Sequence, residues 1–238
     1  MVNMLFGLVY MKNEKMSFDI SAAVLALGLK CAVFTLGNIH NSEADREFEE
    51  IKAQAIRDIL ADLSLEKIVT DPLLQGFRQL HEAVGRSNKR HVSSSENLLK
   101  LLLQTGQLPH VNLLVDIYNL VSVKTRLSLG AHDVSAIGGN IHLRLTTGEE
   151  RFWPLGSGAL KPVGSGEYAY IDDQNNILCR LEVRQGEKTK ITLDTTECFC
   201  IVQGNPVTES EYIRAATEEL ITLIKRFCGG QEQMLYTS

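Results

Sequence analysis

The chain has 238 residues, of which 44% are hydrophobic and 22% are charged. This composition excludes a disordered chain, since disorder requires fewer apolar and more charged residues. The formal net charge is −5, so the overall field does not attract nucleic acid, although a local basic face can still bind it.

The cysteines and the apolar stretches indicate the compartment. The five cysteines are an odd number, and no two have Cys-x-x-Cys spacing. The apolar run Met4–Met11 is too short for a secretion signal and lacks a basic leading segment, and no stretch approaches a membrane span. Cys198 and Cys200 share one face of a predicted strand without a partner at metal-ligand spacing, which favours core packing. We therefore expect a cytoplasmic protein with reduced thiols, no metal and no membrane partner.

The first third of the chain predicts two strands followed by two helices. Residues 1–16 are interpreted as an extension that precedes the domain. The strands and helices are then expected, in chain order, at Phe18–Ile20, at Lys30–Leu36, at Glu43–Leu63 with Ser42 as N-cap, and from Asp71-Pro72 to a stop at Gly85.

A polar loop and two further helices follow. Arg86–His91 is the most basic stretch of the chain. Ser93–Ser95 cap a leucine-rich helix that stops at Gly106. The next segment, Val111–Thr125, is apolar and is predicted to be helical. Three polar residues interrupt it at spacings of four and three, which would place them on one helical face: Asn112, Asp116 and Asn119.

From Gly138 onward the pattern is typical of short strands joined by turns. Strands are predicted at Ile141–Leu145, Arg151–Trp153, Glu167–Ile171, Ile177–Val183 and Cys198–Val202. Glu211–Phe227 is an amphipathic helix, and residues 231–238 are expected to form a tail. No repeat or linker separates these elements, so residues 17–230 are predicted to form one α+β domain.

The order of motifs is similar to that of a known domain. The matching pieces are Phe77-Arg78 on a helix, the basic loop 86–91, the Ser-capped helix start 94–99, the Asn-x-x-x-Asp-x-x-Asn helix 112–119, the turn Leu127–Asp133, Gly148-Glu149 and Thr189–Thr192. Together they resemble the tRNA-editing domain of the phenylalanyl-tRNA synthetase beta subunit over about residues 78–202, with no synthetase attached. The resemblance implies a β-sandwich-like core of unusual topology flanked by helices.

Members of that family hydrolyse a misattached amino acid, typically tyrosine, from the 3′ end of tRNA. The resemblance implies a free-standing aminoacyl-tRNA deacylase that acts in trans, with tRNA or its aminoacylated 3′ end as partner and no DNA. An aminoacyl ester is already activated, so the site needs a placed water and oxyanion donors more than a strong nucleophile. The chain has no Gly-x-Ser-x-Gly motif, which agrees with a site without covalent catalysis. No cofactor is expected.

The turn at 127–133 supplies the candidate catalytic residues His132 and Asp133. Gly130 stands where the family has a histidine, and His132 stands where it has a phenylalanine. His132 is therefore the candidate for positioning water or the tRNA terminus, with Asp133 beside it. The alternative is a structural histidine whose orientation is fixed by Asp133.

The candidate substrate-binding residues are Asn112, Asp116, Asn119, Glu167 and Gln203. The three polar residues of the predicted helix either face a pocket or cap neighbouring loops. Glu167 either accepts the ammonium or phenol of a bound amino acid or is a solvated carboxylate at a strand end. Gln203 is the nearest polar residue to the place where the resemblance implies a substrate-recognising glutamate, so tyrosine specificity is not predicted.

The candidate tRNA-binding residues are Arg78, Arg86, Lys89 and Arg90, for which the alternative is a solvated charged surface. Two other functions stay open. A non-catalytic module that binds an amino acid, a nucleotide fragment or tRNA is supported by Gly130 and by the acidic net charge. Hydrolysis of a small amino-acid ester or amide unrelated to tRNA is the third hypothesis.

Overall fold

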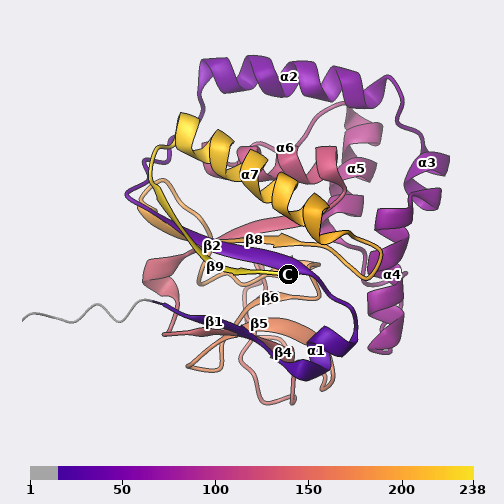
Figure 1. The fold of residues 1–238 in the computed structure, drawn as a ribbon, viewed down its shortest axis with the longest axis vertical. Coiled ribbons are helices and arrows are strands. Elements are labelled where there is room, and N and C mark those ends of the chain that lie inside the picture. Colours follow the sequence, from indigo (N-terminus) through magenta and orange to yellow (C-terminus); the bar gives the residue numbers. More distant parts are fainter. Residues whose placement is uncertain (1–15) are drawn as a thin grey trace, which may run out of the picture.

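The computed structural model describes residues 16–238, so the expected extension over residues 1–16 lies, apart from Met16, outside the described part of the chain. The described part has three layers, in which helices lie on one sheet and that sheet lies on a second one (Figure 1). Its helices are α1 (Ala22–Ala26), α2 (Arg46–Leu60), α3 (Leu65–Thr70), α4 (Pro72–Ala83), α5 (Ser94–Thr105), α6 (Leu113–Thr125), α7 (Ser210–Phe227) and the short 3-10 turn η1 (Val134–Ala136).

The central sheet has the strand order β3-β8-β2-β9, and all of its pairs are antiparallel. Its strands are β2 (Cys31–Gly37), β3 (Ser128–Asp133), β8 (Glu197–Gln203) and β9 (Gln231–Thr237). On β2, Phe34 and Leu36 pack with the helices, whereas Cys31 and Val33 pack with the second sheet. Because both faces are buried, β2 has the continuous apolar sequence of a strand covered on two sides.

The second sheet has the order β1-β4-β5-β6-β7, with β1 and β4 parallel and the other pairs antiparallel. Its strands are β1 (Phe18–Ile20), β4 (Ile141–Leu145), β5 (Tyr168–Asp172), β6 (Ile177–Arg180) and β7 (Arg184–Gln185). Tyr168 and Tyr170 face the central sheet and share a buried cluster with Val33 and Phe199. The two sheets therefore face each other, and the predicted α+β class with a sandwich-like core is confirmed.

The N-cap residues predicted from the sequence can be compared with those in the structure. Asp71 caps α4 and Ser93 caps α5, as expected from the sequence. Ser42 was predicted to cap the first long helix, but that prediction is wrong. The Asp45 carboxylate accepts from the Phe48 amide at 2.9 Å, so α2 begins three residues further on. The short helix α3 between α2 and α4 was not predicted.

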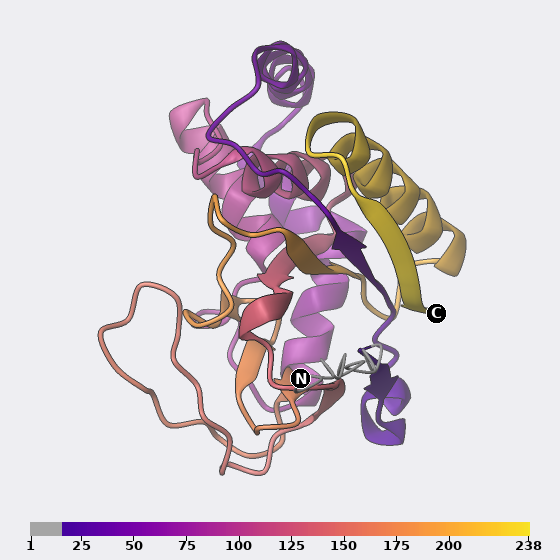
Figure 2. The same cartoon turned by 90° about the vertical axis from the view of Figure 1, so that its left-hand side faces the viewer.

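Two segments differ more strongly from the sequence predictions. Arg151–Trp153 forms only isolated bridges, because Pro154 follows and the chain leaves the sheet in a long loop between β4 and β5. Figure 2 shows this loop projecting to one side of the layers. Residues 231–238, predicted as a tail, instead form β9 at the edge of the central sheet, where Tyr236 packs on Phe18 with 5.6 Å between the ring centroids.

Removing residues 231–238 is expected to lower the free energy of unfolding by at least about 2 kcal/mol, because it removes the backbone ladder and the aromatic contact. It also exposes β2 as a bare apolar edge, which favours aggregation. Thermal unfolding with light scattering measures both effects. If the truncated chain has an unchanged melting temperature and scatters no more light, residues 231–238 contribute nothing to the fold and behave as the tail that the sequence predicted.

Candidate functional site

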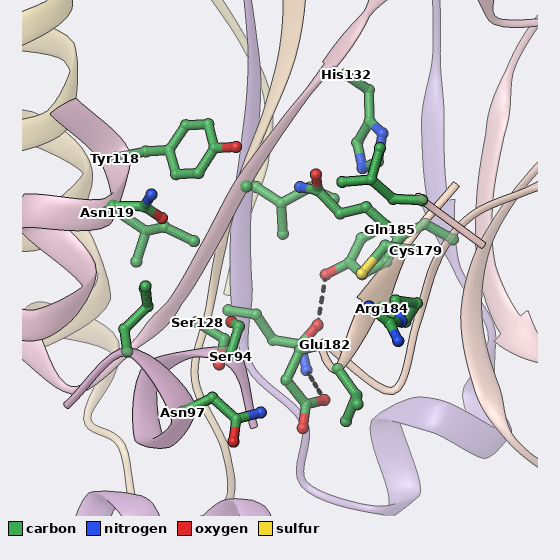
Figure 3. A pocket seen from close by; sticks show the side chains of 18 of the residues that line it. Ser94, Asn97, Tyr118, Asn119, Ser128, His132, Cys179, Glu182, Arg184 and Gln185 are labelled. Atoms are coloured by element: carbon green, nitrogen blue, oxygen red, sulfur yellow. Dashed lines mark hydrogen bonds between the residues drawn. The ribbon is translucent and has the colours of Figure 1, made fainter. Parts of the chain in front are cut away.

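A cavity of about 300 Å³ lies where the β3 edge of the central sheet meets α5, α6 and the β6–β7 turn (Figure 3). Its apolar lining includes Leu98, Leu101 and Ile201. Its polar lining comes from segments far apart in sequence: Ser94, Asn97, Asn119, Ser128, His132, Glu182, Arg184, Gln185 and Gln203. A mostly apolar wall with a few convergent polar groups is the usual form of a small-ligand site.

The segment 127–133, predicted as a turn, is the edge strand β3, and this correction decides which side chains reach the cavity. Successive residues of a strand point to opposite faces. Gly130 and His132 therefore lie on the cavity side, whereas Ala131 packs among the helices. The Asp133 carboxylate accepts hydrogen bonds from Ser135 and Thr195 and does not line the cavity.

His132 is fully buried, and Thr189 rather than Asp133 orients it. Its Nδ1 is 2.8 Å from the Thr189 hydroxyl oxygen, whereas its Nε2 has no hydrogen-bond partner among the described residues. Burial lowers the pKa of His132 to about 3, because the imidazolium would lose its hydration. The imidazole is therefore neutral at physiological pH. The structural alternative, in which Asp133 fixes the orientation of His132, is wrong, because Asp133 bonds to Ser135 and Thr195 instead.

Gly130 leaves room for the side chain of Gln185, which comes from β7 in the second sheet. A Cβ atom built on Gly130 would overlap the Gln185 amide nitrogen. The Gln185 side chain makes no hydrogen bond to any described residue, and the same holds for Asn119 across the cavity. The side chains of Asn119 and Gln185 thus lie on two sides of the cavity (Figure 3), and that of Gln185 lies against Gly130.

Glu182 is the centre of a buried hydrogen-bond network at the back of the cavity. Its carboxylate accepts from the Tyr168 hydroxyl at 2.6 Å and from the Gln203 amide at 2.8 Å, and it lies 2.6 Å from His81 Nε2. Gln203 in turn accepts from the Tyr170 hydroxyl at 3.0 Å. Burial alone would lower the pKa of His81, but the Glu182 carboxylate outweighs it and raises that pKa.

The backbone that presents Glu182 to the cavity is strained. Leu181 and Glu182 have φ angles of 52° and 43°, in the left-handed region that side-chain-bearing residues avoid. Each such residue costs about 1 kcal/mol or more and persists only where its surroundings fix it. The three partners of the Glu182 carboxylate supply that constraint. Sequence reasoning missed Glu182 and Gln185 because neither belongs to a motif.

The predicted substrate-binding residues divide into two groups. Asn119 and Gln203 line the cavity. Asn112 caps α6 by accepting a hydrogen bond from the Val115 amide at 3.1 Å. It therefore has the structural role that the sequence offered as the alternative to facing a pocket. Asp116 is buried and accepts from Lys52 at 2.8 Å and from the Val111 amide, away from the cavity.

Glu167 is neither solvated nor in the cavity. It is 1% exposed and forms ion pairs with Arg86 and Arg180. Burial would raise its pKa, but the two guanidinium groups outweigh burial and lower it. Arg78 likewise pairs with the buried Glu96 at 2.9 Å. These pairs commit Arg78 and Arg86, two of the predicted tRNA-binding residues, to internal contacts.

Lys89 and Arg90, the other two predicted tRNA-binding residues, are exposed. Neither forms an ion pair with a described residue. They therefore keep their charge available to solvent or to a ligand.

One group of possible metal ligands lies outside the cavity. Glu49, His110 and Asp116 have side-chain atoms within 4.8 Å of one another. The Lys52 ammonium lies 2.6 Å from Glu49 and 2.8 Å from Asp116, so a cation already occupies the group. Burial would lower the pKa of Lys52, but the two carboxylates raise it, which keeps the ammonium charged.

The stability of the fold should fall in acid because of His132. The unfolded chain takes up a proton at this residue near pH 6.5, whereas the folded chain does so only near pH 3. Between these values the unfolded state binds more protons, so its free energy falls relative to the folded state. In His132→Gln, the loss of unfolding free energy between about pH 7.5 and about pH 5 should shrink by about 2 kcal/mol. Equal losses in both proteins, measured by urea unfolding, would contradict a buried neutral imidazole.

Comparison with known proteins identifies the family of this chain. Among solved structures, an N-terminal fragment of the phenylalanyl-tRNA synthetase beta subunit from Pyrococcus horikoshii is similar, with 15% identity and a TM-score of 0.47. The alignment covers 91% of this chain and 50% of that one, so the chain spans half the length of the fragment. A search of curated proteins finds no match. Within residues 16–238, no helix has the length and apolar content needed to cross a membrane. A model of the B3/4 domain family matches residues 77–229, which is more than half of the chain, and the chain therefore belongs to the B3/4 domain family.

Proposed function

We propose that the chain is an aminoacyl-tRNA deacylase that acts in trans and hydrolyses the ester between an amino acid and the 3′ end of tRNA. The observation that carries this proposal is the convergence of unpaired polar groups on one cavity. Asn119, Gln185 and His132 come from three different elements and retain hydrogen-bonding capacity toward the cavity. Of these three groups, only the His132 Nε2 atom is buried without a partner, which is unusual for a polar atom inside a protein. The amides of Asn119 and Gln185 make no hydrogen bond to a described residue, so they are free to bind polar groups of a ligand.

The cavity suits the amino-acid part of such a substrate. Its volume of about 300 Å³ is at the lower end of the range for small-ligand sites, which fits one aminoacyl group. Leu98, Leu101 and Ile201 offer apolar contacts to a side chain. The amides of Asn119 and Gln185 offer N–H donors to the carbonyl oxygen of the ester.

The reaction is direct attack of water on the ester carbonyl. The water oxygen bonds to the carbonyl carbon, the bond to the ribose oxygen breaks, and a proton from the water passes to that oxygen. Amide donors from Gln185 and Asn119 stabilise the oxyanion that forms on the carbonyl oxygen. His132 remains neutral, and its unpartnered Nε2 orients the water.

Covalent catalysis by the cysteine of this cavity is disfavoured. Burial raises the pKa of the Cys179 thiol to about 12. The thiolate is the reactive form, and at neutral pH it would be a negligible fraction. An activated ester does not require it.

The purified protein is expected to deacylate at least one member of an aminoacyl-tRNA panel, with tyrosyl-tRNA of the phenylalanine type tested first. Gln185→Ala should lower kcat about 100-fold, the usual effect of losing one oxyanion donor. Gln54→Ala on the exposed face of α2 is the matched control and should have no effect. Release no faster than the uncatalysed rate for every member of the panel would refute the proposal.

A second candidate function is binding without hydrolysis. One observation favours it: four cavity residues have pKa values displaced away from neutrality. Burial lowers that of His132 and raises those of Cys179, Tyr118 and Tyr170. None of these four groups exchanges a proton readily near neutral pH, as a general acid or base must.

The variant His132→Ala distinguishes a chain that only binds its ligand from one that also hydrolyses it. If the chain only binds, calorimetric titration with amino acids and uncharged tRNA should show saturable binding without turnover, and the variant should retain a nearly unchanged Kd. If the chain hydrolyses, the same variant should lose most of the deacylation rate because the water is no longer oriented. A deacylation rate abolished by His132→Ala would exclude the binding-only function.

A further inference from the structure

A second and larger hollow, of about 780 Å³, adjoins the cavity. The two share four lining residues, Asn97, Leu155, Val183 and Arg184, and therefore lie next to each other. The hollow runs between the segment 90–92 and the loop that joins β4 to β5. We call it the basic groove, and define it by Arg90, Lys161, Arg180 and Arg184 together with the apolar Phe152 and Leu155.

The charge of the basic groove is opposite to that of the whole chain. Four of its lining residues are Arg or Lys, and none is Asp or Glu, in a protein with a net charge of −5. Arg90, Lys161 and Arg184 are exposed, and no described carboxylate pairs with them. Arg180 is different, because it pairs with Glu167 and lies over the Phe152 ring at 5.9 Å from the centroid.

The groove also offers surfaces that are not charged. Leu155 is 38% exposed at the junction with the cavity, and Pro154 lies next to it. A positively charged groove that follows the phosphates is the common feature of proteins that hold unpaired nucleotides. Here Leu155 and Pro154 add apolar contact for a ribose or a base edge, since the aromatic ring of Phe152 is buried. A small anion would use the cations but leave this apolar surface without a role.

We infer that the basic groove binds the single-stranded nucleotides that precede the 3′-terminal adenosine, so that the ester enters the cavity past Arg184. This inference rests on the proposed function, since the cavity would hold the aminoacyl group. The strand is unpaired in this arrangement, because a cavity of about 300 Å³ admits one acyl group and has no room for a base pair. Arg90 is one of the residues predicted from the sequence to bind tRNA, and Lys161, Arg180 and Arg184 line the groove with it.

The test uses a fluorescein-labelled single-stranded RNA of a few nucleotides that ends in an unacylated 3′ adenosine. Fluorescence anisotropy gives the Kd of the full chain between about 50 and about 200 mM salt. The groove variant carries Arg90→Gln, Lys161→Gln and Arg184→Gln. The control variant removes the same charge elsewhere, through Arg46→Gln, Arg214→Gln and Lys225→Gln, which are exposed residues of α2 and α7.

The groove variant should raise the Kd at the lowest salt at least about tenfold and reduce the slope of log affinity against log salt by about 2, since each phosphate contact contributes about 0.7. The control variant should match the wild type. The inference is overturned if the wild type shows no saturable binding, if the groove variant binds as the wild type does, or if the control variant loses as much. Equal affinity for a blunt duplex of the same length also overturns it.

Hydrolysis is measured separately, with aminoacyl-tRNA and with the corresponding aminoacyl-adenosine, which has no phosphates. The ratio of kcat/KM for the two substrates should fall at least about tenfold in the groove variant and not in the control. An unchanged ratio means that the groove inference fails while hydrolysis stands. If the wild type cleaves neither ester but groove-dependent RNA binding is observed, the proposed hydrolysis fails while the groove stands.

Discussion

Helices cover one face of the central sheet and the second sheet covers the other, so β2 and β8 must supply apolar side chains on both faces. Every other element is placed by this requirement. The second sheet carries Tyr168 and Tyr170 toward the centre, and their hydroxyls need partners once buried. Those partners are Glu182 and Gln203, so the constraint on the sheet creates the polar network behind the cavity.

This network ties together the residues at the back of the cavity. A buried carboxylate with three partners is far less costly than one with an unpaired oxygen, and losing one partner leaves the others uncompensated. Glu182 can therefore hold a strained turn in place at the junction of the two sheets. Gln185 follows three residues later in the chain, so the fixed turn also places its side chain over Gly130. The cavity therefore has a back wall fixed by the Glu182 network and an amide held over Gly130.

The sequence predicts the helices and buried strands well, because caps such as Asp71 and Ser93 and long apolar runs are local signals. It also predicts the family, which the B3/4 match confirms. It does not predict β3, because a segment containing Gly130 and His132 shows no strand pattern until β8 pairs with it. The sequence also does not predict β9, because this largely polar segment shows no strand pattern until it pairs with β2. In the site, Asn119 and Gln203 are found from sequence, whereas Gln185 depends on contact between two sheets.

The distribution of charge decides how a nucleic acid can approach. With 29 acidic residues against 24 Lys and Arg, the surface as a whole repels a polyanion. Internal pairs reduce the available positive charge further, since Glu96 and Glu167 hold Arg78, Arg86 and Arg180. A basic groove on such a surface is attractive only to the part of a strand that fits inside it. Repulsion elsewhere then favours the end of a strand over its middle, because an end brings the fewest phosphates against the acidic surface. If the basic groove holds a 3′ end as we propose, the acidic surface around it would favour that end over the rest of the strand, at the cost of overall affinity.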